Sequence, residues 1–287
     1  MALSIGLEPK GADSVQGLVI VDPPRSGESN MAIDEALLQN ATPSWPVVLR
    51  VYRWDRPTLS IGHFQRIDDR IDVPHLSDLP WVRRKTGGGA IVHDQELTYS
   101  ILIPNRANQS VKGHSEALYR AVHMSFVEEL KKLGWNARLA ESCTCKASEE
   151  KIPEHFLCFS RRSPVDLIID SDKILGSAQR RSATGLLQHG SLLISRSQST
   201  PELCGLLDAP GGSFPNHPKK MRKKGTDVAS LISANSDNES SKRGLDDWLE
   251  FFVDTLKTGM SGLLQIEWRK GTIEDLFPGV NWNYPPR

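Results

Sequence analysis

Arg-Arg-Lys-Thr-Gly-Gly-Gly-Ala-Ile-Val-His-Asp, residues 83–94, is the stretch of this sequence that says most about the fold. Glycine loses much conformational freedom when it is ordered and brings no side chain to pack, so three in a row need a reason. One reason is a backbone that must touch a ligand, because unhindered N–H groups can line a concave surface for an acyl or phosphoryl oxygen. The stretch therefore predicts a binding loop, with a flexible hairpin turn as the alternative.

The spacing excludes two familiar phosphate-binding loops. No Gly-Lys followed by Ser or Thr comes after the glycines, and the GxGxxG pattern of dinucleotide-binding loops is absent. Paired arginines before the glycines and a His-Asp pair after them favour ligand binding over a plain turn. We expect the substrate to contact this loop through Arg84, Gly87, Gly88, Gly89 and His93.

The composition is that of an ordinary globular protein. The 287 residues are 38% hydrophobic, and the 35 basic and 35 acidic side chains cancel. A net charge of zero gives no overall attraction to nucleic acid or to an anionic membrane. No apolar run approaches the roughly 18 residues that a membrane span needs. Residues 1–16 lack the apolar core of a signal peptide, so we expect a cytoplasmic protein with reduced cysteines.

Hydrophobic periodicity predicts an α/β protein with largely antiparallel or mixed sheets. The runs that we expect to form strands are 17–22, 47–54, 58–64, 90–93, 97–104, 165–170, 173–179 and 187–195. Helices are expected over residues 29–39, 115–133 and 245–256. Ser29 or Asn30 is the expected N-cap of the first helix. An irregular stretch is expected between Trp135 and about Leu157, and a polar loop over residues 230–243.

Four motifs, in order along the chain, resemble the biotin/lipoate A/B protein ligase superfamily in its lipoate and octanoate branch. Besides residues 83–94, the matching stretches are SNMAIDEALL (29–38), LRVYRWDRPTLSIGHFQ (49–65), and DLIIDSDKILGSAQRR (166–181) with LLQHGSLLI (186–194). Motifs in this order extend over most of the chain. The sequence is therefore identified as a member of that superfamily.

The resemblance implies a fold and a domain plan. The fold is a mixed α/β fold of the class II aminoacyl-tRNA synthetase and biotin synthetase type, with mixed and antiparallel sheets flanked by helices. The pocket is expected under the glycine loop. The catalytic domain is expected over residues 17–262, with a polar loop at about 233–243 and terminal extensions at 1–16 and 263–287.

Lys173 and the residues after it form a second candidate site. Taken alone, a lysine beside a polar turn is typical of a solvated surface. The small residues Gly176-Ser177-Ala178 would let a substrate lie against the strand. The resemblance implies that Lys173 is a functional lysine that contacts the acyl carbonyl or an acyl-adenylate. His189 and Gly190 are expected in the pocket wall, and not in catalysis.

Cys158 decides between two kinds of chemistry. Taken alone, a cysteine among aromatic residues is typical of a buried, inert thiol. The spacing from Cys158 to the following Asp-Leu pair and the Gly-Ser-Ala-Gln hairpin is similar to that of LipM-type octanoyltransferases. The resemblance implies that Cys158 carries an acyl thioester and that Lys173 stabilises the thiolate and the oxyanion. About 90 residues follow the second signature, too few for the extra C-terminal domain of bacterial lipoate ligases.

The predicted function is transfer of octanoyl from acyl-carrier protein, through the cysteine thioester, to a lysine of a lipoyl-type carrier domain. The acceptor would be glycine cleavage H protein or dehydrogenase E2, with no cofactor, nucleic acid or membrane involved. An ATP-dependent lipoate–protein ligase, which uses ATP and Mg and needs no cysteine, is one alternative. An octanoyl or lipoyl amidotransferase, which also uses a cysteine, is another.

A zinc site is the alternative that would exclude the thioester. Cys143, Cys145, His155 and Cys158 form a C-x-C…H-x-x-C pattern with four zinc-type ligands. A non-catalytic member that binds lipoyl domains and holds structural zinc is the corresponding non-enzyme hypothesis, although we expect no metal. Without zinc, His155 is a candidate general base because it precedes the cysteine by three residues. The basic run 219–224 is a solvated surface or a docking patch for acidic carrier proteins.

Overall fold

Most strands belong to one large mixed sheet. The computed structural model describes residues 14–105, 115–140, 156–160, 162–209 and 239–282. Among these residues, eight strands form a sheet in the order β11-β1-β2-β6-β10-β9-β8-β7, and three form a small sheet in the order β4-β3-β5. The large sheet consists of β1 (Val15–Val21), β2 (Val47–Tyr52), β6 (Glu96–Pro104), β7 (Ala137–Leu139), β8 (Leu167–Ile169), β9 (Asp172–Arg181), β10 (Gly185–Leu193) and β11 (Ile266–Gly271). The small sheet consists of β3 (Thr58–Ile61), β4 (Trp81–Arg83) and β5 (Ile91–His93).

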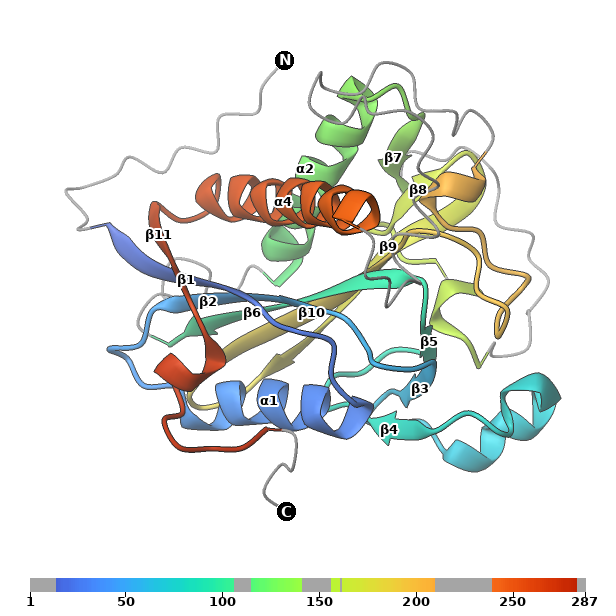
Figure 1. The fold of residues 1–287 in the computed structure, drawn as a ribbon, viewed down its shortest axis with the longest axis horizontal. Coiled ribbons are helices and arrows are strands. Elements are labelled where there is room, and N and C mark those ends of the chain that lie inside the picture. Colours follow the sequence, from blue (N-terminus) through green and yellow to red (C-terminus); the bar gives the residue numbers. More distant parts are fainter. Residues whose placement is uncertain (1–13, 106–114, 141–155, 161, 210–238, 283–287) are drawn as a thin grey trace.

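Helices cover both faces of the large sheet (Figure 1). Helices α2 (Ser115–Lys132) and α4 (Glu239–Ser261) pack together over one face, and α1 (Gly27–Asn40) lies on the other. Strands β2 and β6, in the middle, are buried along their whole length, as expected for strands covered on both sides. None of the helices in the described part of the chain is long and apolar enough to cross a membrane.

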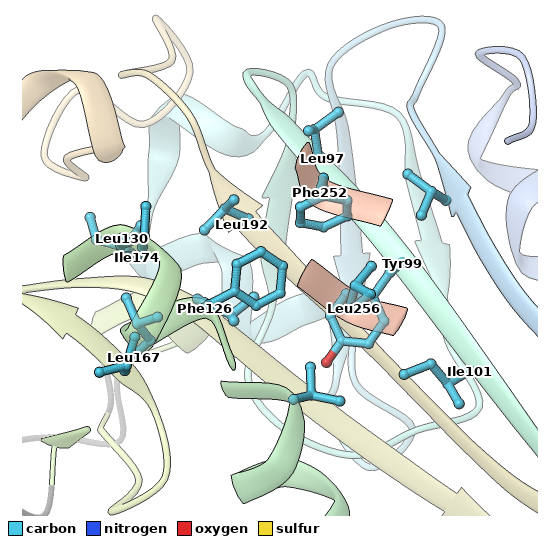
Figure 2. Close-up of a cluster of buried hydrophobic side chains, with 14 of the residues drawn as sticks. Leu97, Tyr99, Ile101, Phe126, Leu130, Leu167, Ile174, Leu192, Phe252 and Leu256 are labelled. Atoms are coloured by element: carbon cyan, nitrogen blue, oxygen red, sulfur yellow. The ribbon is translucent and has the colours of Figure 1, made fainter. Parts of the chain in front are cut away.

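The larger hydrophobic core lies under α2 and α4 (Figure 2). The rings of Phe126 from α2 and Phe252 from α4 have centroids 5.2 Å apart. They belong to one cluster with Tyr99 and Ile101 of β6, and all four side chains are fully buried. Burying a side chain of this size stabilises a fold by about 1.5–3 kcal/mol. Apolar side chains at helical spacing in α2 and α4 therefore face the sheet.

A second core joins α1 to the opposite face of the sheet. Ile33 and Leu37 of the helix pack with Ile20, Val48 and Leu187 of the strands. Strands β1 and β2 are parallel, so α1 is the crossover between them, as parallel strands require. This arrangement places the start of α1 beside the small sheet.

Three strands were not predicted from the sequence. Strand β7 lies in the stretch expected to be irregular, and β4 precedes the glycine loop. Both have three residues, which is too short to show a period. Strand β11 lies inside the predicted terminal extension 263–287, yet it pairs in parallel with β1, with Val15 opposite Ile266. Its position at the edge of the sheet explains its polar sequence.

The first and last helices begin earlier than expected. Ser26, and not Ser29 or Asn30, is the N-cap of α1, because its hydroxyl accepts from the backbone N–H of Ser29 at 3.3 Å. The amide of Asn30 is buried and donates instead to two backbone carbonyls. Helix α4 begins at Glu239, six residues before the expected start. The rest of the predicted polar loop, residues 230–238, lies outside the described residues.

Candidate active site

A pocket of about 420 Å³ lies where the large sheet meets the small one. Strands from both sheets, α1, the glycine loop and the short 3-10 helix η5 (Cys158–Ser160) contribute to its wall. The lining residues are Met31, Tyr52, Trp54, Ser60, Arg84, Gly88, Ile91, His93, Thr98, Cys158, Gly176, Ser177, Ala178, His189, Gly190 and Ser191. The pocket therefore collects residues from all four sequence motifs.

The glycine loop and the cysteine segment touch through their backbones. Ala90 N–H donates to the carbonyl of Phe156 at 2.8 Å, and Cys158 N–H donates to the carbonyl of Ala90 at 2.7 Å. The two segments thus pair like very short parallel strands. A Cβ added to Gly89 would lie 2.9 Å from both the Cα and the backbone nitrogen of Cys158. The lack of a side chain at Gly89 is what lets the loop reach the cysteine.

Arg84 is a buried arginine that holds the glycine loop. Its guanidinium donates to the carbonyls of Gly87 at 2.8 Å, Gly89 at 2.6 Å and Ser60 at 3.0 Å. Burial lowers the pKa of Arg84 to about 10, against the opposing effect of nearby Cys158, so the side chain is a cation at neutral pH. Its Nε–H has no partner among the described residues. Arg84 also lines the pocket.

Lys173 reaches the cysteine from the start of β9. Its Nζ lies 3.6 Å from Sγ of Cys158, 3.4 Å from the carbonyl oxygen of Cys158 and 2.9 Å from Oδ2 of Asp166. The side chains of Lys173 and Asp166 are both almost fully buried, whereas Cys158 is half-buried. Hydrogen bonds from a charged donor are stronger than neutral ones. The ammonium is therefore placed to donate to an anionic sulfur.

His189 connects the glycine loop to helix α1. Its Nε2 lies 2.5 Å from the hydroxyl of Thr86, and its Nδ1 lies 3.4 Å from Oδ2 of Asp34. Burial lowers the pKa of His189, although Asp34 opposes the shift. The neutral ring donates from Nδ1 to the carboxylate and accepts from Thr86 at Nε2, because a carboxylate can only accept. These bonds hold the imidazole of His189 in the pocket wall.

His93 is part of a second buried chain of hydrogen bonds. Its Nδ1 lies 2.5 Å from Oε1 of Glu96, and its Nε2 lies 2.7 Å from the hydroxyl of Ser60. The ring therefore donates to the carboxylate, and Ser60, which contacts its other nitrogen, accepts in turn from Arg84 at 3.2 Å. Trp54 stacks on the imidazole with ring centroids 3.9 Å apart. His93 thus helps to fix the guanidinium that holds the loop.

Ser177 is held by a third chain, which enters from helix α2. Nδ1 of His123 lies 2.5 Å from the carbonyl oxygen of Val165, so this nitrogen donates. Its Nε2 then accepts from the hydroxyl of Ser177 at 2.7 Å. Tyr99 donates to the same hydroxyl at 2.6 Å and accepts from Gln188 at 2.9 Å. Ser177 therefore donates its hydroxyl hydrogen to His123, and not to a ligand.

The comparisons with known proteins identify the family. Residues 26–245 match the family described as Lipoyl protein ligase A/B catalytic domain. The chain belongs to this family. It is 37% identical over 172 residues to octanoyltransferase LipM of Kyrpidia tusciae, a match that covers 59% of this chain and 62% of that relative. It is 32% identical over 261 residues to octanoyltransferase LipM of Brevibacillus brevis, which covers 89% of this chain and 90% of the relative.

Solved structures show the same fold. The bi-partite lipoate protein ligase of Thermoplasma acidophilum superimposes with a TM-score of 0.53 at 22% identity, covering 93% of this chain and 92% of that one. Lipoate-protein ligase A bound with ATP also gives a TM-score of 0.53, at 20% identity, covering 94% and 98%. The predicted mixed α/β fold of this superfamily is thereby confirmed. The match to the Kyrpidia relative spans less than two thirds of that protein's length.

Nine of the twelve site residues predicted from the family motifs line the pocket. They are Arg84, Gly88, His93, Cys158, Gly176, Ser177, Ala178, His189 and Gly190. Of the other three, Lys173 contacts Cys158 with its ammonium, and Gly89 packs on the cysteine backbone. A Cβ on Gly87 would meet no atom within 4 Å, so this glycine is set apart from the other two. The structure brings the residues together, and their catalytic or binding roles stay predictions.

Several supporting residues were missed at the sequence level. Asp34, Ser60, Thr86 and Asp166 lie inside the family motifs, so the motifs carried a signal that residue type alone did not reveal. His123 lies in an amphipathic helix on a face that is otherwise apolar and fully buried. A buried histidine on such a face is a sign of a polar partner across the helix interface, because buried polar groups are nearly always hydrogen-bonded.

The zinc alternative rests largely on residues outside the described part of the chain. Cys143, Cys145 and His155, which would be ligands or a base, fall in residues 141–155. Within the described part, no group of three or more His, Cys, Asp or Glu side chains could hold a metal ion. The basic run 219–224 also lies outside the described residues. These expectations therefore stay predictions.

Replacing His123 with glutamine should reduce the loss of unfolding free energy that occurs as the pH falls below neutral. Burial lowers the pKa of His123 from 6.5 to about 4. Between these two pH values the imidazole is protonated in the unfolded chain but stays neutral in the folded chain. Stability is therefore lost as the pH falls through this window. From pH 7 to pH 5 this residue should cost about 2 kcal/mol of unfolding free energy.

Urea denaturation of wild type and His123→Gln at pH 7 and pH 5 measures this difference. The wild type should lose more unfolding free energy between the two pH values than the variant, by that amount. His75→Gln, which removes an exposed histidine beside Glu202, is the control for the loss of a histidine from the surface. Equal pH dependence of wild type and His123→Gln would contradict the assignment of a neutral, buried ring.

Proposed function

We propose that this chain is an octanoyltransferase that carries octanoyl as a thioester on Cys158. The observation that carries the proposal is the pocket-lining sulfur of Cys158 with the buried ammonium of Lys173 at 3.6 Å. A ligase that works through an acyl-adenylate has no use for a cysteine in this position. The octanoyltransferases LipM that the chain resembles, at 32–40% identity, support the same activity.

In the first step the Cys158 thiolate attacks the carbonyl carbon of an octanoyl thioester on acyl-carrier protein. A carbon–sulfur bond to Cys158 forms, and the bond to the carrier thiol breaks. The carrier leaves as a thiolate that takes up a proton from solvent. The ammonium of Lys173 stabilises the attacking thiolate and the oxyanion of the tetrahedral intermediate.

In the second step an uncharged lysine amine of the acceptor domain attacks the thioester carbonyl. The amide bond forms, the bond to Cys158 breaks, and the proton released by the nitrogen leaves with solvent or returns to the sulfur. Because one thioester replaces another in the first step, no energy from ATP is needed. We propose a lipoyl-accepting domain, glycine cleavage H protein or dehydrogenase E2, as the acceptor. The two protein partners would use one site in turn.

Intact-protein mass spectrometry tests the proposal directly. The purified chain is mixed with octanoyl-[acyl-carrier protein] without ATP, and then with an acceptor domain. A hydroxylamine-labile adduct of one octanoyl group, followed by octanoylated acceptor, is the expected result. Modification of the acceptor only with lipoate and ATP, and no adduct, would make the chain a ligase. An adduct formed from an octanoylated domain, but not from the carrier protein, would make it an amidotransferase.

Replacing Lys173 with methionine should slow formation of the acyl-enzyme by about 100- to 1,000-fold, the range for removal of one preorganised charged donor. Methionine keeps the length of the side chain against Gly176 and removes the ammonium. Single-turnover mass spectrometry measures the rate. Lys132→Met, which removes an exposed lysine of α2, is the matched control and should react like the wild type. A Lys173→Met enzyme within threefold of the wild type would remove the lysine from the mechanism.

A further inference from the structure

Asp166 is a buried carboxylate behind the candidate lysine. Its side chain is only 4% exposed, and Oδ2 lies 2.9 Å from Nζ of Lys173. The same oxygen accepts from the backbone N–H of Ser163 at 2.6 Å. A buried charge is costly unless it is paired and hydrogen-bonded, and these contacts meet both needs. Asp166 directly precedes β8, and β8 pairs with β9, the strand that carries Lys173.

The lysine side chain is confined between the carboxylate and the sulfur. A Cβ on Gly176 would lie 2.6 Å from Cε of Lys173 and 3.8 Å from Oδ1 of Asp166, so the lysine lies flat over that glycine. The ring of Phe159 is 5.3 Å from Nζ. With the glycine backbone and this ring beside it, the ammonium contacts Asp166 as well as the sulfur and carbonyl of Cys158.

We propose that Asp166 is a positioning residue for acyl transfer, which holds the ammonium of Lys173 against Sγ of Cys158 and acts on the sulfur through that lysine. The inference rests on the proposed function, because it concerns the same cysteine. The residue does not react itself. It sets where the positive charge sits and keeps the ammonium from turning away from the sulfur.

The direction in which Asp166 changes the reactivity of the Cys158 thiolate distinguishes this positioning role from a purely structural one. A carboxylate cannot donate a hydrogen bond to a sulfur anion, and a negative charge nearby repels a thiolate. Asp166 therefore helps the thiolate only while Lys173 stands between them. Without the ammonium, the carboxylate brings no benefit and slightly opposes the thiolate. A residue that merely supports the fold would act in the same direction with or without Lys173.

A double-mutant cycle on the reactivity of Cys158 tests the inference. Asp166→Asn is made in the wild type and in Lys173→Met, and two rates are measured for each of the four proteins. One is alkylation of Cys158 by iodoacetamide, located by peptide mapping, and the other is acylation by octanoyl-[acyl-carrier protein]. In the wild type, Asp166→Asn should lower both rates at least about 10-fold. In Lys173→Met it should leave them within about twofold, or raise them.

Equal slowing by Asp166→Asn in both backgrounds, or no slowing in the wild type, would overturn the inference. Alkylation needs no substrate, so it tests the role of Asp166 even if the carrier protein turns out not to be the donor. Asp172→Asn is the matched control, because it removes the same charge one residue before Lys173 and should leave both rates unchanged. If Asp166→Asn does not melt cooperatively, Asp166→Ser, which keeps an acceptor for the Ser163 N–H, is carried through the same cycle.

Discussion

Replacing Cys158 with alanine should abolish the octanoyl adduct and lower transfer to the acceptor domain by at least about 1,000-fold, as expected when a nucleophile is removed. The thioester needs the sulfur, and none of the other described residues places a thiol in the pocket. The cysteine is half-buried and packs through its backbone on Gly89 and Ala90. Loss of the sulfur should therefore leave the fold intact, with a melting temperature within about 4 °C of the wild type.

Mass spectrometry of the adduct and a continuous assay of acceptor octanoylation measure the two effects. Cys204→Ala is the matched control, since Cys204 is also a free half-buried thiol, contacts Arg196 and does not line the pocket. It should form the adduct at the wild-type rate. A hydroxylamine-labile adduct that persists on Cys158→Ala would place the thioester on another cysteine and contradict the proposed function.

Replacing Gly89 with alanine should slow acyl-enzyme formation by about 100-fold, although alanine adds a single methyl group. The new Cβ would lie 2.9 Å from two backbone atoms of Cys158, and backbone cannot rotate away as a side chain can. Either the glycine loop or the cysteine segment must move. A displacement of about 1 Å in a catalytic group can cost about 100-fold in rate. The loop carbonyl that accepts from Arg84 at 2.6 Å would move as well.

Gly87→Ala is the control two residues away in the same loop. A Cβ at Gly87 meets no atom within 4 Å, so this variant should acylate within about threefold of the wild type. Rates of adduct formation and melting temperatures of both variants give the comparison. The reverse order, with Gly87→Ala slow and Gly89→Ala normal, would mean that the loop does not approach the cysteine as described.

The strands and helices of the core could be predicted because their sequences carry their own pattern. Leu118, Val122, Phe126 and Leu130 recur at helical spacing and are all fully buried in α2. Strand β6 was recognised because it is long, apolar and covered on both faces. Strand β11 was not, because an edge strand exposes polar side chains, and its parallel pairing with β1 joins residues about 250 positions apart in the sequence.

The candidate site likewise contains residues that the sequence indicated and contacts that it did not. The sequence indicated Arg84 and the glycines through the loop itself, Lys173 through the family motif, and Cys158 through its spacing to the residues that follow. It did not indicate Asp166 as the partner of Lys173. Nor did it show that Gly89, and not Gly87, meets the cysteine, since three adjacent glycines look alike in a sequence.

The family, the class of the fold and the residues from which a thioester site could be built all follow from the amino-acid sequence. The contacts of the Cys158 sulfur with the ammonium of Lys173, and of the Cys158 backbone with Gly89, are seen only in the folded chain. The physical reason is the range of the interactions. Periodicity and turn chemistry act between near neighbours in the chain, whereas this site is made by packing the glycine loop on a segment some 70 residues later, which only the completed sheets bring together.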